Sequence, residues 1–310
     1  DLVFTTVAMF AEMDAEILRE AKRRHVPTVG MSRGWDIYTN SGIMRIVPDK
    51  LLVHNRYAEE TAQTHQFISQ SKILRVGFPR NDYFLRSNLY EPREEFLAKL
   101  GIDPKKRIIF FGAMENFWFP HDDEIARTFD ELVECGKLPS DLMMLFRPYP
   151  GSAGPVERIR GLKHVVPDIR SFTTSAADRW EMREKETAHL VNSLRHSEMV
   201  VVVATTLAID GMALDKPAIS TGFQKTPLPY WFSAQRFLDH WSHWTALLST
   251  GGVRRADTPQ EFASAVREYL ENPQRDADGR TRARKIFLEP YDGQAGERIA
   301  KILKDDLAAI

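Results

Sequence analysis

The sequence lacks several features that mark whole classes of protein. Its 310 residues include a single cysteine, Cys135, so no disulfide can form within the chain, and the lone thiol fits a reducing cytoplasm. No stretch approaches the ~20 apolar residues that a membrane-spanning helix needs, although contact with a membrane surface stays open. The formal net charge is -1, which provides no overall basic field for nucleic acid. We therefore expect no nucleic-acid partner.

Common catalytic motifs are also absent. The sequence contains no P-loop, no G-x-G-x-x-G, no H-E-x-x-H, no paired C-x-x-C and no G-x-S-x-G. His240 and His243 are three residues apart on one predicted helix and have no third ligand, which makes a poor metal site. We expect no metal and no cofactor. Cys135 lies on a predicted helix, where a buried, small apolar role is expected.

What the sequence does contain is an alternation of apolar runs with helical patterns. A composition of 43% hydrophobic and 27% charged residues is ordinary for a globular protein, so the pattern can be interpreted as a packed fold. The alternation predicts an α/β fold of parallel sheets with crossover helices. The expected strands are Leu2–Thr5, Thr28–Met31, Lys50–His54, Ile73–Val76, Arg107–Phe111, Leu142–Phe146, His164–Val166, Met199–Val203 and Ala218–Thr221.

Helical patterns fill most of the intervening segments, and a polar loop is expected at Ser171–Trp180. The expected helices are Ala11–Arg24, Tyr57–Ser69, Glu94–Leu100, Glu124–Lys137, Glu184–Arg195, Leu207–Leu214, Phe237–Leu248, Pro259–Glu271, Arg280–Phe287 and Gln294–Lys304. Basic residues at 22–25 and 280–285 are expected on solvated helix surfaces.

A polar connector after Pro79 divides the pattern into two Rossmann-like domains. We expect an acceptor-side domain at 1–88 and a nucleotide-donor-binding domain at 89–310, which ends in a closing helix. The chain begins in the middle of a strand pattern, so the first domain is expected to be incomplete. Two open sheets would face each other across a cleft, with ligands at the carboxyl ends of the strands.

The strongest candidate site follows the most apolar strand, at 204–211. Thr205 and Thr206 begin a helix, where hydroxyls and backbone N–H groups can bind a phosphate. Asp210, one turn later, could accept hydrogen bonds from ribose hydroxyls. The alternative is that Thr205 is a helix N-cap and Asp210 a solvent-facing residue.

Two further strand ends of the second domain carry candidate groups. Arg147 and Tyr149 follow strand Leu142–Phe146, where an arginine can clamp a phosphate and a tyrosine can stack on a base. Gly112 follows strand Arg107–Phe111 and would let a ligand approach the backbone closely, with Glu115 and His121 as nearby polar groups. A proline-stiffened loop and a plain turn are the alternatives.

Two strand ends of the first domain are weaker candidates. Arg80 and Asp82, in Gly77–Asp82, would fix a hinge or contact a ligand in the cleft. Asp36, in Met31–Asp36, is the nearest candidate general base, although capping the next element explains it as well.

The order of these motifs resembles one family. G-F-P-R-N-D at 77–82, R-P-Y-P at 147–150 and V-V-V-A-T-T-L-A-I-D-G-M-A-L-D-K-P at 201–217 are similar to the CDP-glycerol glycerophosphotransferases and to related surface-carbohydrate glycosyltransferases of the GT-B fold. The tail Asp292–Ala295 with Arg298 resembles the same group. The resemblance implies a donor site formed by Arg147, Tyr149, Thr205, Thr206 and Asp210, with the acceptor on the first domain.

The first domain departs from that family at one residue. The glycerophosphotransferases usually carry a W-H-G segment whose histidine is the proposed base, and Arg33 stands there in Ser32–Gly34. The catalytic candidates are therefore Arg33 and Asp36, and the difference favours a sugar transferase over a glycerol phosphate transferase.

These observations predict a metal-independent transferase of bacterial surface-polymer assembly. It would move a glycosyl or glycerol phosphate group from a nucleotide-activated sugar or CDP-glycerol to a polysaccharide, glycolipid or polyol acceptor. The expected location is the cytoplasm. Any peripheral contact with a membrane would be at the inner face of the cell membrane. A nucleotide-sugar epimerase of similar fold and a degenerate nucleotide-sugar-binding protein are the alternatives.

Overall fold

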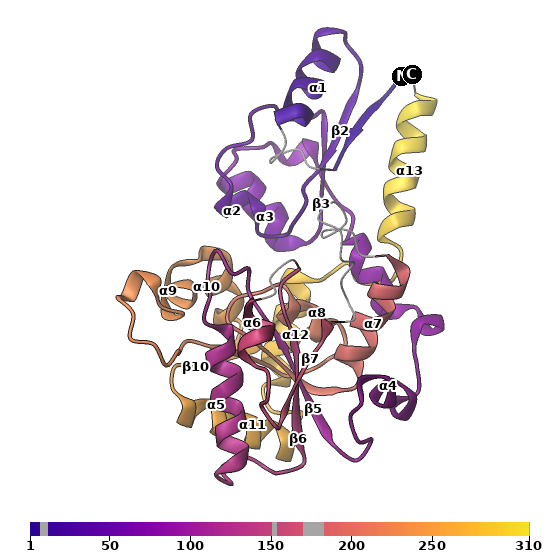
Figure 1. The fold of residues 1–310 in the computed structure, drawn as a ribbon. Helices are drawn as coiled ribbons and strands as arrows, with labels where there is room; N and C mark the ends of the chain where they lie inside the picture. The colour runs from indigo at the N-terminus through magenta and orange to yellow at the C-terminus, as the bar shows by residue number, and fades with distance from the viewer. Residues whose placement is uncertain (7–11, 151–153, 170–182, 310) are drawn as a thin grey trace. The chain divides into compact units, whose positions relative to one another are not determined.

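The structure is a computed structural model that describes residues 1–6, 12–150, 154–169 and 183–309. The chain divides into two compact units (Figure 1). Unit 1 consists of residues 1–85 together with 283–310, and unit 2 of residues 86–282.

Unit 1 is built on a four-stranded parallel sheet in the order β1-β2-β3-β4. Its strands are β1 (Val3–Thr5), β2 (Thr28–Met31), β3 (Lys50–Val53) and β4 (Ile73–Arg75). Because strand order equals chain order, every connection crosses the sheet in the same direction. Because neighbouring strands pair in parallel, all four carboxyl ends meet at one edge.

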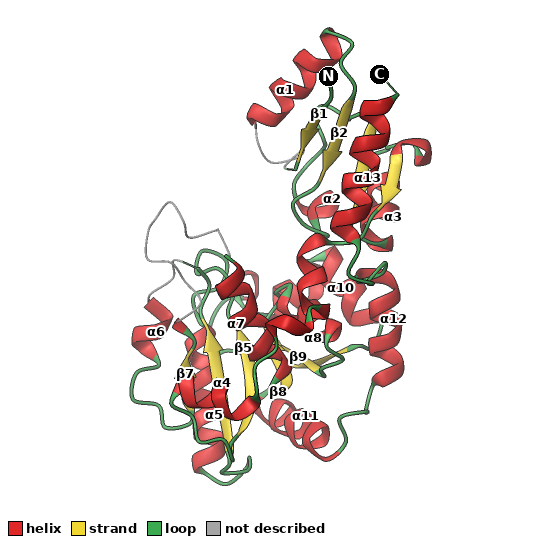
Figure 2. Ribbon diagram, turned by 90° about the vertical axis from the view of Figure 1, so that its right-hand side faces the viewer, coloured by secondary structure: helices red, strands yellow, loops and turns green. Residues whose placement is uncertain are grey.

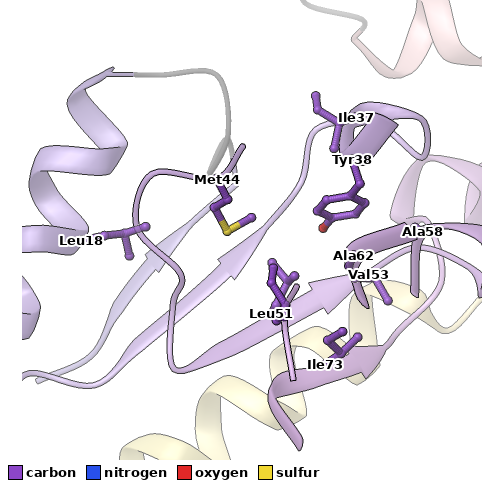
Figure 3. Packing of buried hydrophobic residues seen from close by; sticks show 10 residues of the cluster. Leu18, Ile37, Tyr38, Met44, Leu51, Val53, Ala58, Ala62 and Ile73 are labelled. Atoms are coloured by element: carbon purple, nitrogen blue, oxygen red, sulfur yellow. The ribbon is translucent and has the colours of Figure 1, made fainter. Parts of the chain in front are cut away.

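Helices cover both faces of this sheet. On one face lie α1 (Glu12–Arg23), α2 (Ile37–Asn40) and α3 (Arg56–Thr64). Leu18, Tyr38 and Ala62 bring these helices onto Leu51 and Val53 of β3 (Figure 3). The other face packs against α13 (Ala295–Ala308), whose Ile299 joins a cluster with Val29, Met31, Leu52 and Val76.

Unit 2 contains a six-stranded parallel sheet in the order β10-β9-β8-β5-β6-β7. Its strands are β5 (Arg107–Gly112), β6 (Leu142–Arg147), β7 (Val165–Pro167), β8 (Ser197–Val202), β9 (Ala218–Thr221) and β10 (Val253–Ala256). The chain runs outward from β5 to β7, then returns to the other side of β5 for β8. The junction of β5 and β8 is thus the switch point at which open α/β sheets bind ligands.

Helices of unit 2 flank this sheet (Figure 2). They are α4 (Arg93–Leu100), α5 (Asp122–Glu134), α6 (Gly154–Arg158), α7 (Glu184–Arg195), α8 (Leu207–Ala213), α9 (Gln235–His240), α10 (Ser242–Ser249), α11 (Pro259–Glu271) and α12 (Ala277–Phe287), the last of which crosses into unit 1. Short 3₁₀ helices occupy Gln70–Lys72, η2 (Pro79–Leu85), Ser87–Leu89 and Tyr230–Phe232.

The predicted α/β class and the parallel sheets are confirmed. All nine predicted strands are present, with ends that agree to within about two residues. Strand β10 was missed because only the two ends of Val253–Ala256 are apolar and the residues between them are arginines. The predicted helix Phe237–Leu248 is two helices, because Trp241 has an extended backbone. The loop expected at Ser171–Trp180 lies outside the described residues.

The two units divide the chain differently from the expected domains 1–88 and 89–310. The C-terminal segment from Ala283 belongs to unit 1, since Ile299, Ile302 and Leu303 of α13 cover the otherwise open face of the four-stranded sheet. Pattern alone could not assign this helix, because its apolar stripe would fit either sheet.

Two predictions about single side chains were wrong. Cys135 is exposed, because it follows the last turn of α5 and does not face the core. Arg280 is buried: its guanidinium donates to the carbonyls of Pro273 and Arg275 and contacts Asp215, so it ties the turn before α12 together. Within the described ranges, no helix has the length and apolar character needed to cross a bilayer.

The packing of α13 gives the first prediction. Ile299→Ala should lower the free energy of unfolding of unit 1 by about 2–4 kcal/mol, because it leaves a cavity against four core residues. Leu307→Ala on the same helix, where the side chain is 52% exposed, should change it by less than about 0.5 kcal/mol. Denaturant unfolding of both variants checks this, and equal effects would contradict the assignment of α13 to unit 1.

Candidate functional site

The carboxyl edge of the six-stranded sheet brings three predicted residues together. In the strand register Gly112 pairs with Arg147 on one side and with Val202 on the other. Thr205 lies three residues beyond Val202. Residues that are far apart in the chain thus meet at the switch point between β5 and β8.

Arg147 is buried at the end of β6 and belongs to a polar network. Its Nη1 donates to Asp168 Oδ2 at 3.2 Å, and the other oxygen of Asp168 accepts from His189 Nε2 at 2.6 Å. Asp168 is fully buried, and its backbone N–H donates to Phe146 O, next to Arg147 in the chain. The carboxylate therefore holds the guanidinium at the sheet edge and offsets its charge.

The sequence interpretation did not identify Asp168 or His189 as candidate residues. Asp168 directly follows strand Val165–Pro167, so its position at a strand end was a usable signal. His189 lies in the middle of α7, where its ring packs against Phe96, and nothing in its local sequence marks it.

The hydroxyl of Thr205 is the second polar group at this edge. Its Oγ1 is buried and has no hydrogen-bond partner among the described residues. Thr205 is not the N-cap that the alternative interpretation required, since Thr206 occupies that position and its side chain does not cap α8. A buried hydroxyl without a partner costs about 1–3 kcal/mol unless a ligand or water satisfies it.

Asp210 and Gly112 have different surroundings from those expected. Asp210 is fully buried, which excludes the solvent-facing alternative. Gly112 is in close contact with α8: a Cβ at this position would overlap the side chain of Leu207. The small residue at the end of β5 therefore serves the packing of α8 against the sheet.

The remaining candidates of unit 2 lie on the loops around this edge. Tyr149 is half-buried just beyond Arg147. His121 contacts Glu124 at 3.0 Å, and Glu124 also accepts the backbone N–H groups of Lys225 and Thr226. Glu115 is half-buried, and its carbonyl accepts from Trp118 and Phe119.

Asp122 is a buried carboxyl that the sequence interpretation missed. One oxygen accepts from the backbone N–H of Met114 at 2.9 Å, and the other has no partner among the described residues. Burial raises the pKa of Asp122 well above its usual range. It holds the loop after β5 in place at the start of α5.

The first-domain candidates mostly serve local structure. Asp36 begins α2 and accepts from Asn40 Nδ2 at 2.7 Å, while Arg33 is exposed. Asp82 is buried and accepts from the backbone N–H of Gly296 at 3.1 Å, in the first turn of α13. Arg80 is half-buried in η2.

The first and last motifs of the family resemblance meet within unit 1. Besides the bond from Gly296 to Asp82, Arg298 donates to Val76 O at 2.8 Å and pairs with Asp292. Gly77 has a φ of +90°, and a Cβ there would meet Pro290 O at 2.8 Å. G-F-P-R-N-D and the tail thus form one joint that attaches α13 to the sheet.

His54 is the most unusual side chain of unit 1. It follows β3, is completely buried, and its ring faces the backbone of Ser32 and Gly34. Its ring packs against Phe78 with centroids 4.2 Å apart. Burial lowers the pKa of His54 to about 4, so the ring is neutral at physiological pH.

The depressed pKa of His54 predicts a loss of stability in mild acid. The unfolded chain binds the proton near pH 6.5 but the folded chain only near pH 4, so stability falls as the pH drops through this window. Between pH 7 and pH 5 the wild type should lose about 2 kcal/mol more unfolding free energy than His54→Phe. Denaturant unfolding at both pH values measures the difference, and parallel losses would refute a buried neutral ring.

The Arg147–Asp168 pair yields a third stability prediction. Asp168→Ala should cost about 3–5 kcal/mol, because it leaves the buried Arg147 guanidinium without its carboxylate. Asp141→Ala breaks the half-exposed pair with Arg107 and should cost less than about 1 kcal/mol. The urea midpoints of the two variants check this. Similar losses of unfolding free energy would show that the buried pair contributes no more to stability than the half-exposed pair.

The comparisons with known proteins agree with this architecture. The family model of the CDP-glycerol:poly(glycerophosphate) glycerophosphotransferases matches residues 42–112, which include β3, β4, G-F-P-R-N-D and β5. The resemblance predicted from the sequence is thereby confirmed. No curated protein matches the chain.

Solved structures share the fold at low sequence identity. The wall teichoic acid polymerase TagF superposes with a TM-score of 0.62 and 14% identity, covering 92% of this chain and 69% of its own. MnaA of S. aureus, solved with UDP, has a TM-score of 0.63 and 13% identity, covering 100% and 77%. The UDP-GlcNAc 2-epimerase of Methanocaldococcus jannaschii has a TM-score of 0.59 and 13% identity, covering 98% and 75%.

At this identity the superpositions establish the architecture alone, and the family match covers less than half of the chain. Together they give one conclusion: this chain has a two-domain GT-B fold and carries, in residues 42–112, the sequence pattern of the CDP-glycerol glycerophosphotransferases.

Proposed function

We propose that the chain transfers a glycosyl or glycerol phosphate group from a nucleotide-activated donor to a hydroxyl acceptor. The observation that carries this is the convergence of Arg147 and Thr205, whose hydroxyl has no partner among the described residues, at the switch point of the six-stranded sheet. A fixed guanidinium and a free hydroxyl suit the phosphates of such a donor.

In the proposed reaction an acceptor oxygen attacks the donor, and the bond to the leaving nucleotide breaks. Negative charge develops on the leaving phosphate, and Arg147, positioned by Asp168, stabilises it. Thr205 donates a hydrogen bond to the same group. Tyr149, Thr206 and Asp210 are proposed to complete the donor site. The proton of the acceptor hydroxyl passes to a base for which Asp36 remains the candidate, and Arg33 is the other catalytic candidate.

The family match extends the proposal to a biological setting. TagF is a wall teichoic acid polymerase, and we propose that this chain also acts in assembly of a bacterial surface polymer. The acceptor would be a polysaccharide, glycolipid or polyol, met at the inner face of the cell membrane. That the transfer requires no metal stays a prediction.

A thermal-shift screen with CDP-, UDP-, GDP- and CMP-linked donors tests the donor site. A true donor at 100 times its dissociation constant should stabilise the protein by about 2.7 kcal/mol. Thr205→Val should weaken donor binding about tenfold without lowering stability, because its hydroxyl has no hydrogen-bond partner among the described residues. Thr245→Val, on α10, is the matched control and should bind normally.

Turnover separates the catalytic role of Arg147 from its structural one. Arg147→Met combined with Asp168→Asn keeps the buried network uncharged and should reduce transfer by ~10²–10³. Transfer within a few-fold of wild type, or no thermal shift with any donor, would refute the donor-site assignment.

A nucleotide-sugar epimerase is the second candidate, because one of the structures with this fold is the UDP-GlcNAc 2-epimerase of Methanocaldococcus jannaschii. An epimerase would convert UDP-GlcNAc with no acceptor present. A transferase would show at most slow hydrolysis under the same conditions.

A further inference from the structure

Asp168, the buried carboxylate beside Arg147, is shared between two elements of unit 2. Its Oδ2 accepts from Arg147 Nη1 at 3.2 Å, and its Oδ1 accepts from His189 Nε2 at 2.6 Å. Because a carboxylate oxygen only accepts, the imidazole Nε2 carries the proton of the second bond. The shorter of these two contacts is the one to His189, so the histidine on α7 is the closer partner of the carboxylate.

The planarity of the carboxylate links the two contacts. The last torsion of an aspartate side chain is broad and roughly two-fold, so rotamer preference alone specifies the carboxylate plane poorly. The hydrogen bond from His189 to Oδ1 fixes that plane and thereby fixes where Oδ2 lies. The place of the Arg147 guanidinium at the sheet edge therefore depends on His189, through Asp168.

The His189 ring is itself held in place by its helix. It packs against the buried Phe96 with centroids 5.3 Å apart. One turn further along α7, the fully buried Asn192 donates to Leu89 O at 2.7 Å and accepts from the backbone N–H of Glu91 at 2.8 Å. These bonds anchor α7 to the chain segment before α4, so the helix gives His189 a fixed position.

Sharing the carboxylate also affects the charge that Arg147 presents. The contact of 3.2 Å from Arg147 to Asp168 is longer than the about 2.7–2.9 Å that is typical of a charged nitrogen and oxygen pair. Hydrogen bonds in a network polarise one another, so the bond from His189 draws negative charge toward Oδ1. The arginine is thus fixed in place and keeps positive charge to direct at a phosphate.

We propose that His189 is a positioning residue of the donor site, which holds one oxygen of Asp168 and so sets the place of the Arg147 guanidinium for the phosphates of the donor. The proposal rests on the proposed function, because the ligand of Arg147 is the donor phosphate assigned there. In this role His189 acts through Asp168 and needs no contact with the donor.

The guanidinium of Arg147 provides a readout that needs no donor. In the full chain labelled with ¹⁵N-arginine, the Nε–H signal of Arg147 is assigned by its loss in Arg147→Lys. His189→Leu keeps an apolar side chain but has no hydrogen-bond donor, so it should shift this signal. His189→Gln, whose amide nitrogen can replace Nε2, should return the signal toward its wild-type position. An Arg147 signal that His189→Leu leaves in place would overturn the proposal.

Affinity for a nucleoside diphosphate measures the consequence for the donor site. With CDP and UDP as probes, His189→Leu should weaken binding about tenfold, the equivalent of one hydrogen bond to a charged group, and His189→Gln should recover most of the loss. Each variant is measured well below its own unfolding temperature, where a merely structural role would leave the affinity unchanged. If His189→Leu does not fold, His189→Asn, whose side chain is too short for the contact with Asp168, replaces it.

His164→Leu is the matched control for both readouts. His164 Nε2 also contacts a carboxylate, that of Glu134 at 2.9 Å. His164 precedes β7, however, and so lies at the amino edge of the sheet, opposite the edge that carries Arg147. His164→Leu should therefore change neither the Arg147 signal nor the affinity for CDP or UDP, and an equal effect in this variant would show that the response is not specific to His189.

The two readouts separate this proposal from the proposed function. If neither nucleotide binds the wild type, the donor-site assignment fails, while a shifted Arg147 signal in His189→Leu still establishes that His189 positions the guanidinium. If CDP or UDP binds the wild type and His189→Leu with equal affinity, the donor site stands and the positioning role of His189 fails.

Discussion

Parallel pairing of strands is the constraint on which both candidate sites depend. In each unit it brings every carboxyl end to one edge, where backbone groups and the side chains that follow the strands converge. Gly112, Arg147 and Val202 are level across three strands, although they span ninety residues of sequence. Without that register, Arg147 and Thr205 would have no common surface on which to act.

The two edges differ in the charge of their buried side chains. At the carboxyl edge of unit 2, Asp168 fixes a buried arginine, and the Thr205 hydroxyl has no hydrogen-bond partner among the described residues. At the equivalent edge of unit 1, the buried His54 is neutral.

The motifs that carry the family resemblance do not all serve chemistry. Asp82 and Gly77, in the most specific of them, attach the first turns of α13 to the four-stranded sheet, and Arg298 completes the joint. A family match that includes residues 77–82 therefore supports the architecture directly. R-P-Y-P and the strand-to-helix junction at Thr205 lie outside the matched residues 42–112.

Sequence by itself determined the fold class, nine of the strands and the donor-side candidates. Buried parallel strands are continuous apolar runs, and this local pattern can be recognised without knowledge of the tertiary arrangement. It also identified Arg147 and Thr205, because both follow such runs. Strand β10 gave no such signal, since Arg254 and Arg255 interrupt it.

Only the tertiary structure decided which unit α13 joins, and which polar groups lack partners. Ile299 could have packed on either sheet, because an apolar stripe does not specify its partner surface. In the sequence, His54 was only the last residue of the expected strand Lys50–His54. No sequence pattern connected Asp168 with His189. Burial and hydrogen bonding depend on residues distant in the sequence, so the neutral His54 and the Arg147–Asp168–His189 network emerge only once the sheets are assembled.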